Sequence, residues 1–515
     1  MNTTRSLSYR SRLALVSRLT AQLKQANIAY CHWKSNHRIG EFLQGAGDLD
    51  LLVSPDDSKR FRAIIDQLGF LPAAPPALHT QPAVAHYYGY DVPSGRFVHL
   101  HVYYRLVTGG LVVKDYELPF AEDLLEGRDS AHGIPTPPVA AECQVFLIRK
   151  MLEAASWTER LLLRRSWPEV RSEWSWLRNG GDQGGDHSTL LHKMTEIWHR
   201  RMGHESSDWI PQAIQALDNA DWRQAARVGK ELQHMLKRHR LSPTSRLTQS
   251  RAIRFAWRAL RRMTGRPNVK RAAGKGGVIA LVGCDGSGKT STVSRLLAAL
   301  SGHFDVRVLH MGRPGAMRWI VSWSRRRRSP SVRAASTDRR PTDSVLRQAG
   351  RCALAWYRLA AARQAHRWAQ QGVIVLCDRY PSLSPGMDGP TESNRIGSSP
   401  IHRWLAKLEA RLYQQLPPAD AVIELTVPLE ILHARLQTRG DRLDEQQRRL
   451  LLARLMQVSS RVIPSQSRFA IDASDSQEEM AKRVMTHLWH ILCRQNTTRN
   501  GRAKPRQPAT GAAAA

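Results

Sequence analysis

A glycine-rich segment constrains the fold of this 515-residue chain more than any other feature. It reads Gly283-Cys284-Asp285-Gly286-Ser287-Gly288-Lys289-Thr290, after the apolar run 278–282 and before a helix-like stretch at 293–300. This is the order of strand, glycine loop and helix that a phosphate-binding loop requires. Glycines let successive backbone N–H groups point at a polyphosphate, and the helix adds the positive end of its dipole. The segment therefore predicts a site for a nucleoside triphosphate.

The side chains of this loop have distinct predicted roles. The ammonium of Lys289 can reach the terminal phosphates, and the hydroxyl of Thr290 can bind Mg²⁺. We expect the nucleotide to be contacted by Gly283, Asp285, Gly286, Ser287, Gly288, Lys289, Thr290 and Ser291. ATP and Mg²⁺ are therefore the predicted cofactors.

A second charged segment, Asp378-Arg379-Tyr380, follows the apolar run 373–377. The carboxyl ends of parallel strands are where such sheets bind ligands. Asp378 is predicted to hold Mg²⁺ through water, and Arg379 is predicted to bind an acceptor phosphate.

A third segment is rich in arginine. Arg435 and Arg439 are spaced i, i+4 on a predicted helix, so they share one side of it, and Arg442 follows. Bidentate donors placed over a donor nucleotide neutralise charge on the phosphoryl group in flight. We therefore predict a catalytic set of Lys289, Asp378, Arg435, Arg439 and Arg442.

The fold class follows from apolar runs that alternate with helical patterns. Five runs between 278 and 472 are continuous rather than alternating, which is typical of a parallel sheet covered by helices on both faces. The predicted class is α/β, with a doubly wound P-loop sheet and a smaller N-terminal α/β domain. The predicted parts are an α/β domain (1–138), a helical region (139–263), a basic linker (264–276), a P-loop domain (277–495) and a disordered tail (496–515). In the helical region we expect a packed core that includes Trp157, Trp167, Trp174 and Trp176.

Taken together, the C-terminal motifs resemble the thymidylate kinase family of nucleoside monophosphate kinases. The glycine loop with Asp285 looks like that family's P-loop, and Asp378-Arg379-Tyr380 looks like its DRY motif. Further matches are the lid-like Arg439-Gly440-Asp441-Arg442, the strand end Ile471-Asp472-Ala473-Ser474, and the helix segment Ala361-Ala362-Arg363-Gln364-Ala365-His366. The resemblance implies transfer of the γ-phosphate of ATP to a nucleoside monophosphate such as dTMP.

The resemblance also implies roles for single residues. Asp285 is implied to hydrogen-bond the acceptor sugar, Arg379 and Arg313 to contact its phosphate, and Arg363 to lie over its base. Gly286 stands where some members carry a catalytic arginine, which matches the arrangement in which the lid supplies that arginine. A homodimer is a further implication.

Several positions depart from the family pattern on the acceptor side. Ala362 replaces a polar residue, and Met387 and Asp388 stand where Tyr and Gln are usual. The insert 323–342 is long and basic. A kinase that acts on a sugar, lipid or glycan acceptor is therefore an alternative to a kinase that acts on dTMP.

Near the N-terminus, Asp48 and Asp50 are spaced i, i+2 on a predicted strand, so both carboxylates project from one face and can share divalent ions. With Ser35 upstream, the region resembles the minimal nucleotidyltransferase superfamily. That family adds a third carboxylate, where this chain has His99. Both an active transferase and a binding-only domain follow from this pattern.

The charge balance widens the range of partners. Lys and Arg number 77 against 44 Asp and Glu, a net charge of +33, which favours polyanionic partners. A nucleotide- or nucleic-acid-binding protein with vestigial catalysis is thus a third hypothesis. The six scattered cysteines suit a reducing cytoplasm, and no apolar run is long enough for a transmembrane segment. We therefore expect a soluble, cytoplasmic protein.

Overall fold

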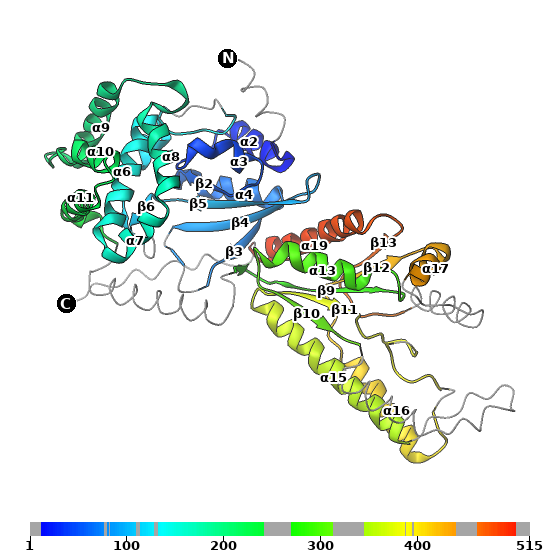
Figure 1. The fold of residues 1–515 in the computed structure, drawn as a ribbon. Helices are drawn as coiled ribbons and strands as arrows, with labels where there is room; N and C mark the ends of the chain where they lie inside the picture. The colour runs from blue at the N-terminus through cyan, green and yellow to red at the C-terminus, as the bar shows by residue number, and fades with distance from the viewer. Residues whose placement is uncertain are drawn as a thin grey trace, which may run out of the picture. The chain divides into compact units, whose positions relative to one another are not determined.

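The computed structural model describes residues 12–76, 80–81, 83–109, 114–127, 132–241, 269–312, 345–386, 388–393, 396–438 and 461–500 (Figure 1). The chain divides into two compact units, which we call unit 1 (Met1–Asn268) and unit 2 (Val269–Ala515). Each is described by itself.

Unit 1 is built on a mixed sheet with strand order β1-β2-β5-β4-β3. Strands β2 and β5 run parallel, and the other neighbours in this order run antiparallel. The register pairs Asp48 with His99 and Asp50 with His101, so these four side chains occupy adjacent positions. The strands are β1 (Tyr30–His32), β2 (Asp48–Val53), β3 (Leu71–Ala74), β4 (Val84–Asp91) and β5 (Arg96–Tyr103).

Amphipathic helices cover this sheet. Helix α4 (Ser58–Gln67) buries Phe61 and Ile65, in agreement with the amphipathic pattern of its sequence. Helix α2 (Ala14–Gln25) buries five side chains on one face, and four of them join Phe61 and Ile65 in one hydrophobic cluster. The short helix α3 (Ile39–Leu43) leads into β2.

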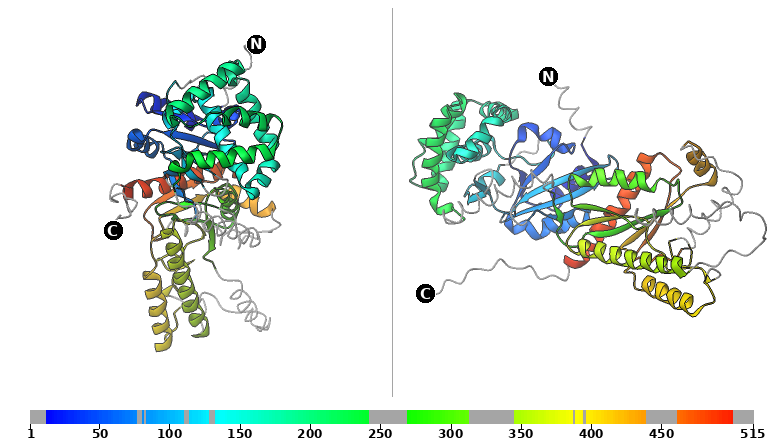
Figure 2. Two further views of the ribbon diagram at one scale, coloured as in Figure 1. Left: turned by 90° about the vertical axis from the view of Figure 1, so that its left-hand side faces the viewer. Right: turned by 60° about the horizontal axis from the view of Figure 1, so that its bottom comes forward.

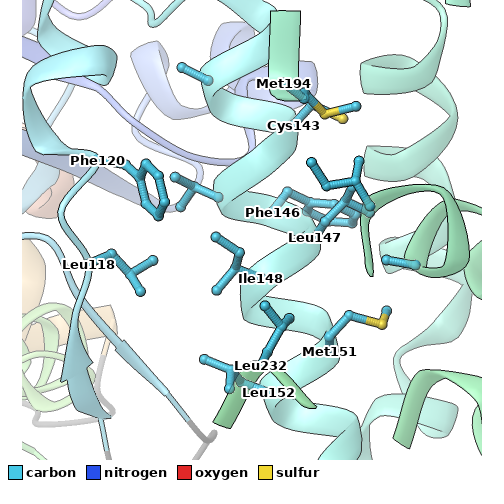
Figure 3. Close-up of a cluster of buried hydrophobic side chains, with 14 of the residues drawn as sticks. Leu118, Phe120, Cys143, Phe146, Leu147, Ile148, Met151, Leu152, Met194 and Leu232 are labelled. Atoms are coloured by element: carbon cyan, nitrogen blue, oxygen red, sulfur yellow. The ribbon is translucent and has the colours of Figure 1, made fainter. Parts of the chain in front are cut away.

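A helical layer completes unit 1. Helix α6 (Val139–Ala155) is buried on almost every side, and Figure 3 shows its Phe146, Leu147 and Ile148 among apolar side chains of its neighbours. Figure 2 shows the helices from α6 to α11 gathered beside the sheet. The remaining elements are β6 (Val107–Gly109), β7 (Lys114–Glu117), α5 (Ala121–Leu125), α7 (Trp157–Arg165), α8 (Trp167–Arg178), α9 (His187–Met202), α10 (Trp209–Asp218) and α11 (Trp222–Met235).

One hydrophobic cluster spans the predicted α/β domain and the predicted helical region. It contains Trp33 and Tyr103 from the sheet side together with Trp174 from α8. Trp167 and Trp176 pack partly buried against it, as expected. Trp157 does not: its side chain is 74% exposed at the start of α7, so that expectation was wrong. A helix as apolar as α6 needs partners on several sides, which explains why the two regions share a core.

Unit 2 contains a parallel sheet with strand order β10-β11-β9-β12-β13, and all four neighbouring pairs run parallel. The predicted parallel sheet is therefore confirmed. The strands are β9 (Gly277–Gly283), β10 (Val306–His310), β11 (Ile374–Asp378), β12 (Ala421–Thr426) and β13 (Arg468–Asp472). The central strand β9 is buried along its whole length, as its continuous apolar sequence requires.

Helices cover both faces of this sheet (Figure 1). Helices α13 (Lys289–Ser301) and α19 (Gln477–Asn500) lie on one face, and α15 (Val345–Gln370) with α16 (Pro400–Gln414) lies on the other. Helix α17 (Leu429–Thr438) follows β12. Every strand of this sheet ends on the same edge, where the glycine loop and Asp378 meet.

The ends of unit 2 extend past the predicted boundaries. Residues 269–276, predicted as linker, contain strand β8 (Arg271–Ala272), and Lys275 makes an ion pair with Asp420. The predicted tail begins inside α19, where the side chain of Asn496 is buried and hydrogen-bonds the backbone of Lys275 in both directions. In the part of the chain that is described, no helix combines the length and apolar character needed to cross a membrane.

Candidate functional site

The glycine loop between β9 and α13 is tightly curled. Gly283, Gly286 and Gly288 all have positive φ angles, of 155°, 91° and 88°. A Cβ atom on Gly286 would lie 2.8 Å from Leu432 Cδ1, so a side chain there would strain the backbone and require Leu432 to shift. The sequence places glycine where this curvature demands it.

Lys289, the first residue of α13, turns back over the loop. Its Nζ donates to the carbonyl oxygens of Gly283 at 3.0 Å and Cys284 at 2.5 Å. Burial lowers the pKa of the Lys289 ammonium, while the nearby carboxylate of Asp285 opposes that shift. The ammonium therefore stands at the mouth of the loop, where phosphate oxygens can replace the two carbonyls as its partners.

Asp378 ends β11 beside the loop. Its Oδ2 accepts from Thr290 Oγ1 at 3.5 Å and lies 3.1 Å from His310 Nδ1. Its Oδ1 is buried and has no hydrogen-bond partner among the described residues. A carboxylate oxygen and a hydroxyl are the hard donors that Mg²⁺ prefers, so this pair fits the predicted metal.

Arg379 has a left-handed backbone, with φ at 72°. Its Nη2 donates to Asp285 Oδ1 at 2.8 Å, so two residues 94 positions apart meet at the glycine loop. A non-glycine residue in this conformation stores local strain, and such strain is held where surrounding contacts fix the residue.

An arginine cluster, made of Arg358, Arg379 and Arg461, surrounds the carboxylate of Asp388. Asp388 accepts from Arg358 Nη2 at 2.8 Å, and its other carboxylate oxygen lies 3.6 Å from Arg379 and 3.5 Å from Arg461. Arg358 and Arg461 are 4% and 6% exposed. Three guanidinium groups thus share one carboxylate, and Nε and Nη2 of Arg461 are buried without a hydrogen-bond partner among the described residues. This surplus of positive charge favours an anionic ligand.

The cleft formed at this edge has a volume of about 200 Å³. It brings together residues predicted from both the loop and the DRY-like segment: Asp285, Gly286, Gly288, Lys289, Thr290, Ser291, Asp378 and Arg379, with His310 added. Ser287 is buried behind the loop, where its Oγ has no described hydrogen-bond partner.

Other predicted site residues lie elsewhere. Arg363 donates to Gln415 Oε1 at 3.0 Å on an exposed face, and it does not line the cleft. Arg435 donates to the carbonyl oxygens of Ala473 at 2.8 Å and Asp475 at 3.4 Å. The predicted residues outside the described part of the chain are Arg313, Arg439, Arg442 and Met387.

No sequence motif pointed to Arg358, Arg461 or His310. No local pattern distinguishes the two arginines among the 77 Lys and Arg residues of the chain. His310 had a usable signal, because it directly follows the predicted strand 306–309 just as Asp378 follows the predicted strand 373–377, and the structure pairs the two positions.

In unit 1, Asp48 and Asp50 do project beside one another but have other partners. His99 Nδ1 donates to Asp48 Oδ1 at 2.6 Å. Lys34 Nζ and His101 Nδ1 each lie 2.9 Å from Asp50 Oδ1. Burial by itself would raise the pKa of Asp50, but Lys34 and His101 outweigh it and hold that pKa far below its usual range.

Ser35, the predicted phosphate contact, is also engaged. Its backbone N and its Oγ both donate to Glu173 Oε1, at 3.0 and 3.2 Å. Within the residues that are described, no group of three or more His, Cys, Asp or Glu side chains is placed to hold a metal ion. The face of β2 and β5 is therefore a network of paired charges rather than a pair of open carboxylates.

Comparisons with known proteins give partial matches. No protein-family model matches the chain. The Escherichia coli K12 protein named uncharacterized ATP-binding protein YghR is 26% identical over 172 residues, which make up 31% of this chain and 68% of YghR. The protein named uncharacterized ATP-binding protein YghS, from the same strain, is 28% identical over 155 residues, which make up 27% of this chain and 62% of YghS.

Among solved structures, deoxyadenosine kinase from M. mycoides with bound dATP aligns with 41% of this chain and 98% of its own. The identity is 16% and the TM-score is 0.26, values too low to place the chain in a fold family.

Proposed function

We propose that this chain is an ATP- and Mg²⁺-dependent phosphotransferase that moves the γ-phosphate to an acceptor carrying an anionic group. The observation that carries the proposal is the cleft in which Lys289, Thr290, Asp378 and Arg379 converge on a curled glycine loop. The partial matches to two proteins named as ATP-binding support the choice of nucleotide.

Each residue of the cleft has a role in this proposal. Lys289 would exchange its loop carbonyls for the terminal phosphates, and Thr290 with Asp378 would hold Mg²⁺, which would neutralise phosphate charge. His310, through its contact with Asp378 Oδ2, orients that carboxylate. Arg435, Arg439 and Arg442 remain the proposed lid arginines.

The arginine cluster supplies the acceptor side. Arg379 reaches the cleft, and Arg358 and Arg461 stand behind it around Asp388. Planar guanidinium groups bind phosphate bidentately, so an acceptor that already carries a phosphate fits here. A nucleoside monophosphate such as dTMP is the first candidate, as the resemblance to thymidylate kinase implies.

A second candidate is a phosphorylated sugar, lipid or glycan. Asp388 stands where the family pattern has a base-side residue, yet here its carboxylate holds three arginines. Arg363, the residue expected over the base, contacts Gln415 instead. Both observations weaken recognition of a nucleobase without affecting recognition of phosphate.

The test is ADP release by the full-length protein with ATP, Mg²⁺ and a panel of dTMP, dUMP, hexose phosphates and lipid phosphates, each beside its dephosphorylated counterpart. We expect turnover only with a phosphorylated acceptor. Arg379→Gln is expected to raise the acceptor KM about 10-fold while changing the KM for ATP less, because the arginine lies on the acceptor side.

Equal turnover with dephosphorylated acceptors would overturn the anionic acceptor. Absence of turnover with any acceptor, together with ATP binding that Lys289→Met weakens, would favour a binding protein with vestigial catalysis. Saturation by dTMP at micromolar concentration decides for the first candidate over the second.

A further inference from the structure

A cluster of cations in unit 1 is not used by the P-loop site. Lys34 follows β1, Lys114 begins β7, and Arg149 lies on α6. Lys114 Nζ donates to Tyr103 Oη at 2.6 Å, and Lys34 Nζ donates to the same oxygen at 3.4 Å. Two ammonium groups from distant parts of the sequence therefore meet at one phenol oxygen.

Aromatic rings hold these cations together. Lys114 Nζ lies 4.6 Å from the centre of the Tyr103 ring, and Lys34 Nζ lies 5.2 Å from the centre of the Trp33 ring. The Arg149 guanidinium lies 5.3 Å from the centre of that same Trp33 ring. Trp33 and Tyr103 are fully buried, and their ring faces attract the cations that lie over them.

The negative charge in the cluster does not balance these cations. Lys34 pairs with Asp50, but within the described residues neither Lys114 nor Arg149 has a carboxylate oxygen within 4 Å. The partly buried His101 beside Asp50 adds no negative charge. Burial, and then the charge of Lys34, lower the pKa of Lys114 well below its ordinary value. The cations are partly buried, and a partly desolvated cation without a counter-charge costs free energy that a bound anion reduces.

The same geometry argues against a two-metal site on this face. Asp50 Oδ1 already lies 2.9 Å from the ammonium of Lys34, and Asp48 accepts from His99. A divalent ion bound there would face Lys34 and would have to displace it from Asp50. The surplus positive charge selects an anion instead.

We propose that Lys34, Lys114 and Arg149 form a metal-independent binding site for a phosphate group in unit 1. The ligand class is a phosphate ester or polyphosphate, whose oxygens accept from the two ammonium groups and the guanidinium. This site lies outside the P-loop unit, and binding there requires no phosphoryl transfer.

The experiment measures anion binding at this site in the full-length protein. Acetylation rates of Lys34 and Lys114 are measured by peptide mass spectrometry in EDTA, at fixed ionic strength, with increasing tripolyphosphate. We expect saturable protection of both lysines, at least 5-fold, and no protection of the exposed Lys193 on α9. ATP and a hexose phosphate serve as further probes. The one that protects the lysines at the lower concentration shows whether the ligand is a nucleotide or a phosphorylated sugar.

Variants keep the proposal falsifiable. Lys114→Met is expected to abolish the protection of Lys34, Lys114→Arg to retain it, and Lys193→Met to match the wild type. Because Lys114 has no carboxylate partner among the described residues, its replacement by Met is not expected to unfold the unit. Protection that persists in Lys114→Met, that appears only with Mg²⁺, or that is absent for all three probes overturns the proposal.

Discussion

The two candidate sites differ in what their acidic side chains are free to do. In unit 2, Asp378 keeps a buried carboxylate oxygen without a described hydrogen-bond partner, and a hydroxyl lies beside its other oxygen. In unit 1, Asp50 lies against a lysine and a histidine, and Asp48 accepts from another histidine. Under our proposals the first arrangement suits a cation and the second suits an anion, and the residues around each carboxylate make the difference.

The strongest test of this contrast removes the ammonium of Lys289. Lys289→Met is expected to lower phosphoryl transfer by roughly 1000-fold, because the ammonium is the phosphate contact of the loop. Protection of Lys34 by tripolyphosphate should be the same as in the wild type. Steady-state ADP release checks the first effect, and Lys407→Met, an exposed lysine on α16, is the control.

Next in size is the effect of removing the shared carboxylate of the arginine cluster. Asp388→Asn leaves Arg358, Arg379 and Arg461 around an uncharged amide, so unit 2 should lose about 3 kcal/mol of stability. Pulse proteolysis in urea, read on peptides of unit 2, measures this loss.

The matched control for that substitution is Asp305→Asn. Asp305 pairs with the half-exposed Arg271, so its loss should cost at most about 1 kcal/mol. Equal costs for both variants would contradict the view that Asp388 organises a buried cluster.

Divalent ions offer a smaller but more specific test. With a non-hydrolysable ATP analogue present, Asp378→Asn should weaken Mn²⁺ binding roughly 10-fold, since it removes an oxygen that orients the metal shell. Asp50→Asn should leave Mn²⁺ binding unchanged. Water-proton relaxation measures both, and a loss of Mn²⁺ affinity confined to Asp50→Asn would reverse the assignment of the two sites.

The last test concerns the pH dependence of unit 1. Burial raises the pKa of Glu142 to about 8, although hydrogen bonds from Asn36 oppose the shift. Between the ordinary pKa of a glutamate and pH 8, the folded chain binds more protons at Glu142 than the unfolded chain does. The free energy of unfolding therefore falls as pH rises, by at most about 1.4 kcal/mol per pH unit.

Glu142→Gln should flatten this slope, whereas Glu231→Gln, an exposed residue of α11, should not. Pulse proteolysis of unit 1 peptides at pH 6, 7 and 8 is the measurement. The neighbours that also titrate or carry charge here are Glu173 and Arg149, so the slope must be compared between variants rather than taken as an absolute value. A wild-type slope retained in Glu142→Gln would assign the effect to another group.

Much of unit 2 was predictable because the sequence patterns that indicate its strands and its glycine loop are local. A continuous apolar run fixes a buried strand, and glycines at fixed spacing fix the curled loop that follows β9. Strand ends in a parallel sheet share an edge, so the meeting of Asp378 with Lys289 and Thr290 followed from the order of motifs. The same reasoning found the Asp48 and Asp50 pair, since residues at i and i+2 of a strand share a face.

What the sequence could not decide is which charges meet across long separations. The spacing of Asp48 and Asp50 predicts a metal site, and this stays a prediction. The fold adds what the spacing could not show: Lys34 lies against Asp50, and Lys114 and Arg149 have no described carboxylate partner. From the sequence, Asp388 suggested altered recognition of a base. In the structure, arginines surround its carboxylate.

The sequence by itself thus determined the phosphate loop, the parallel sheet and the edge where the P-loop site lies, because short-range periodicity dictates backbone conformation. Only the tertiary structure decided the partners of each carboxylate and the joining of the α/β and helical regions into one core. Ion pairs and packed cores depend on distances between remote segments, and those distances exist only once the chain has folded.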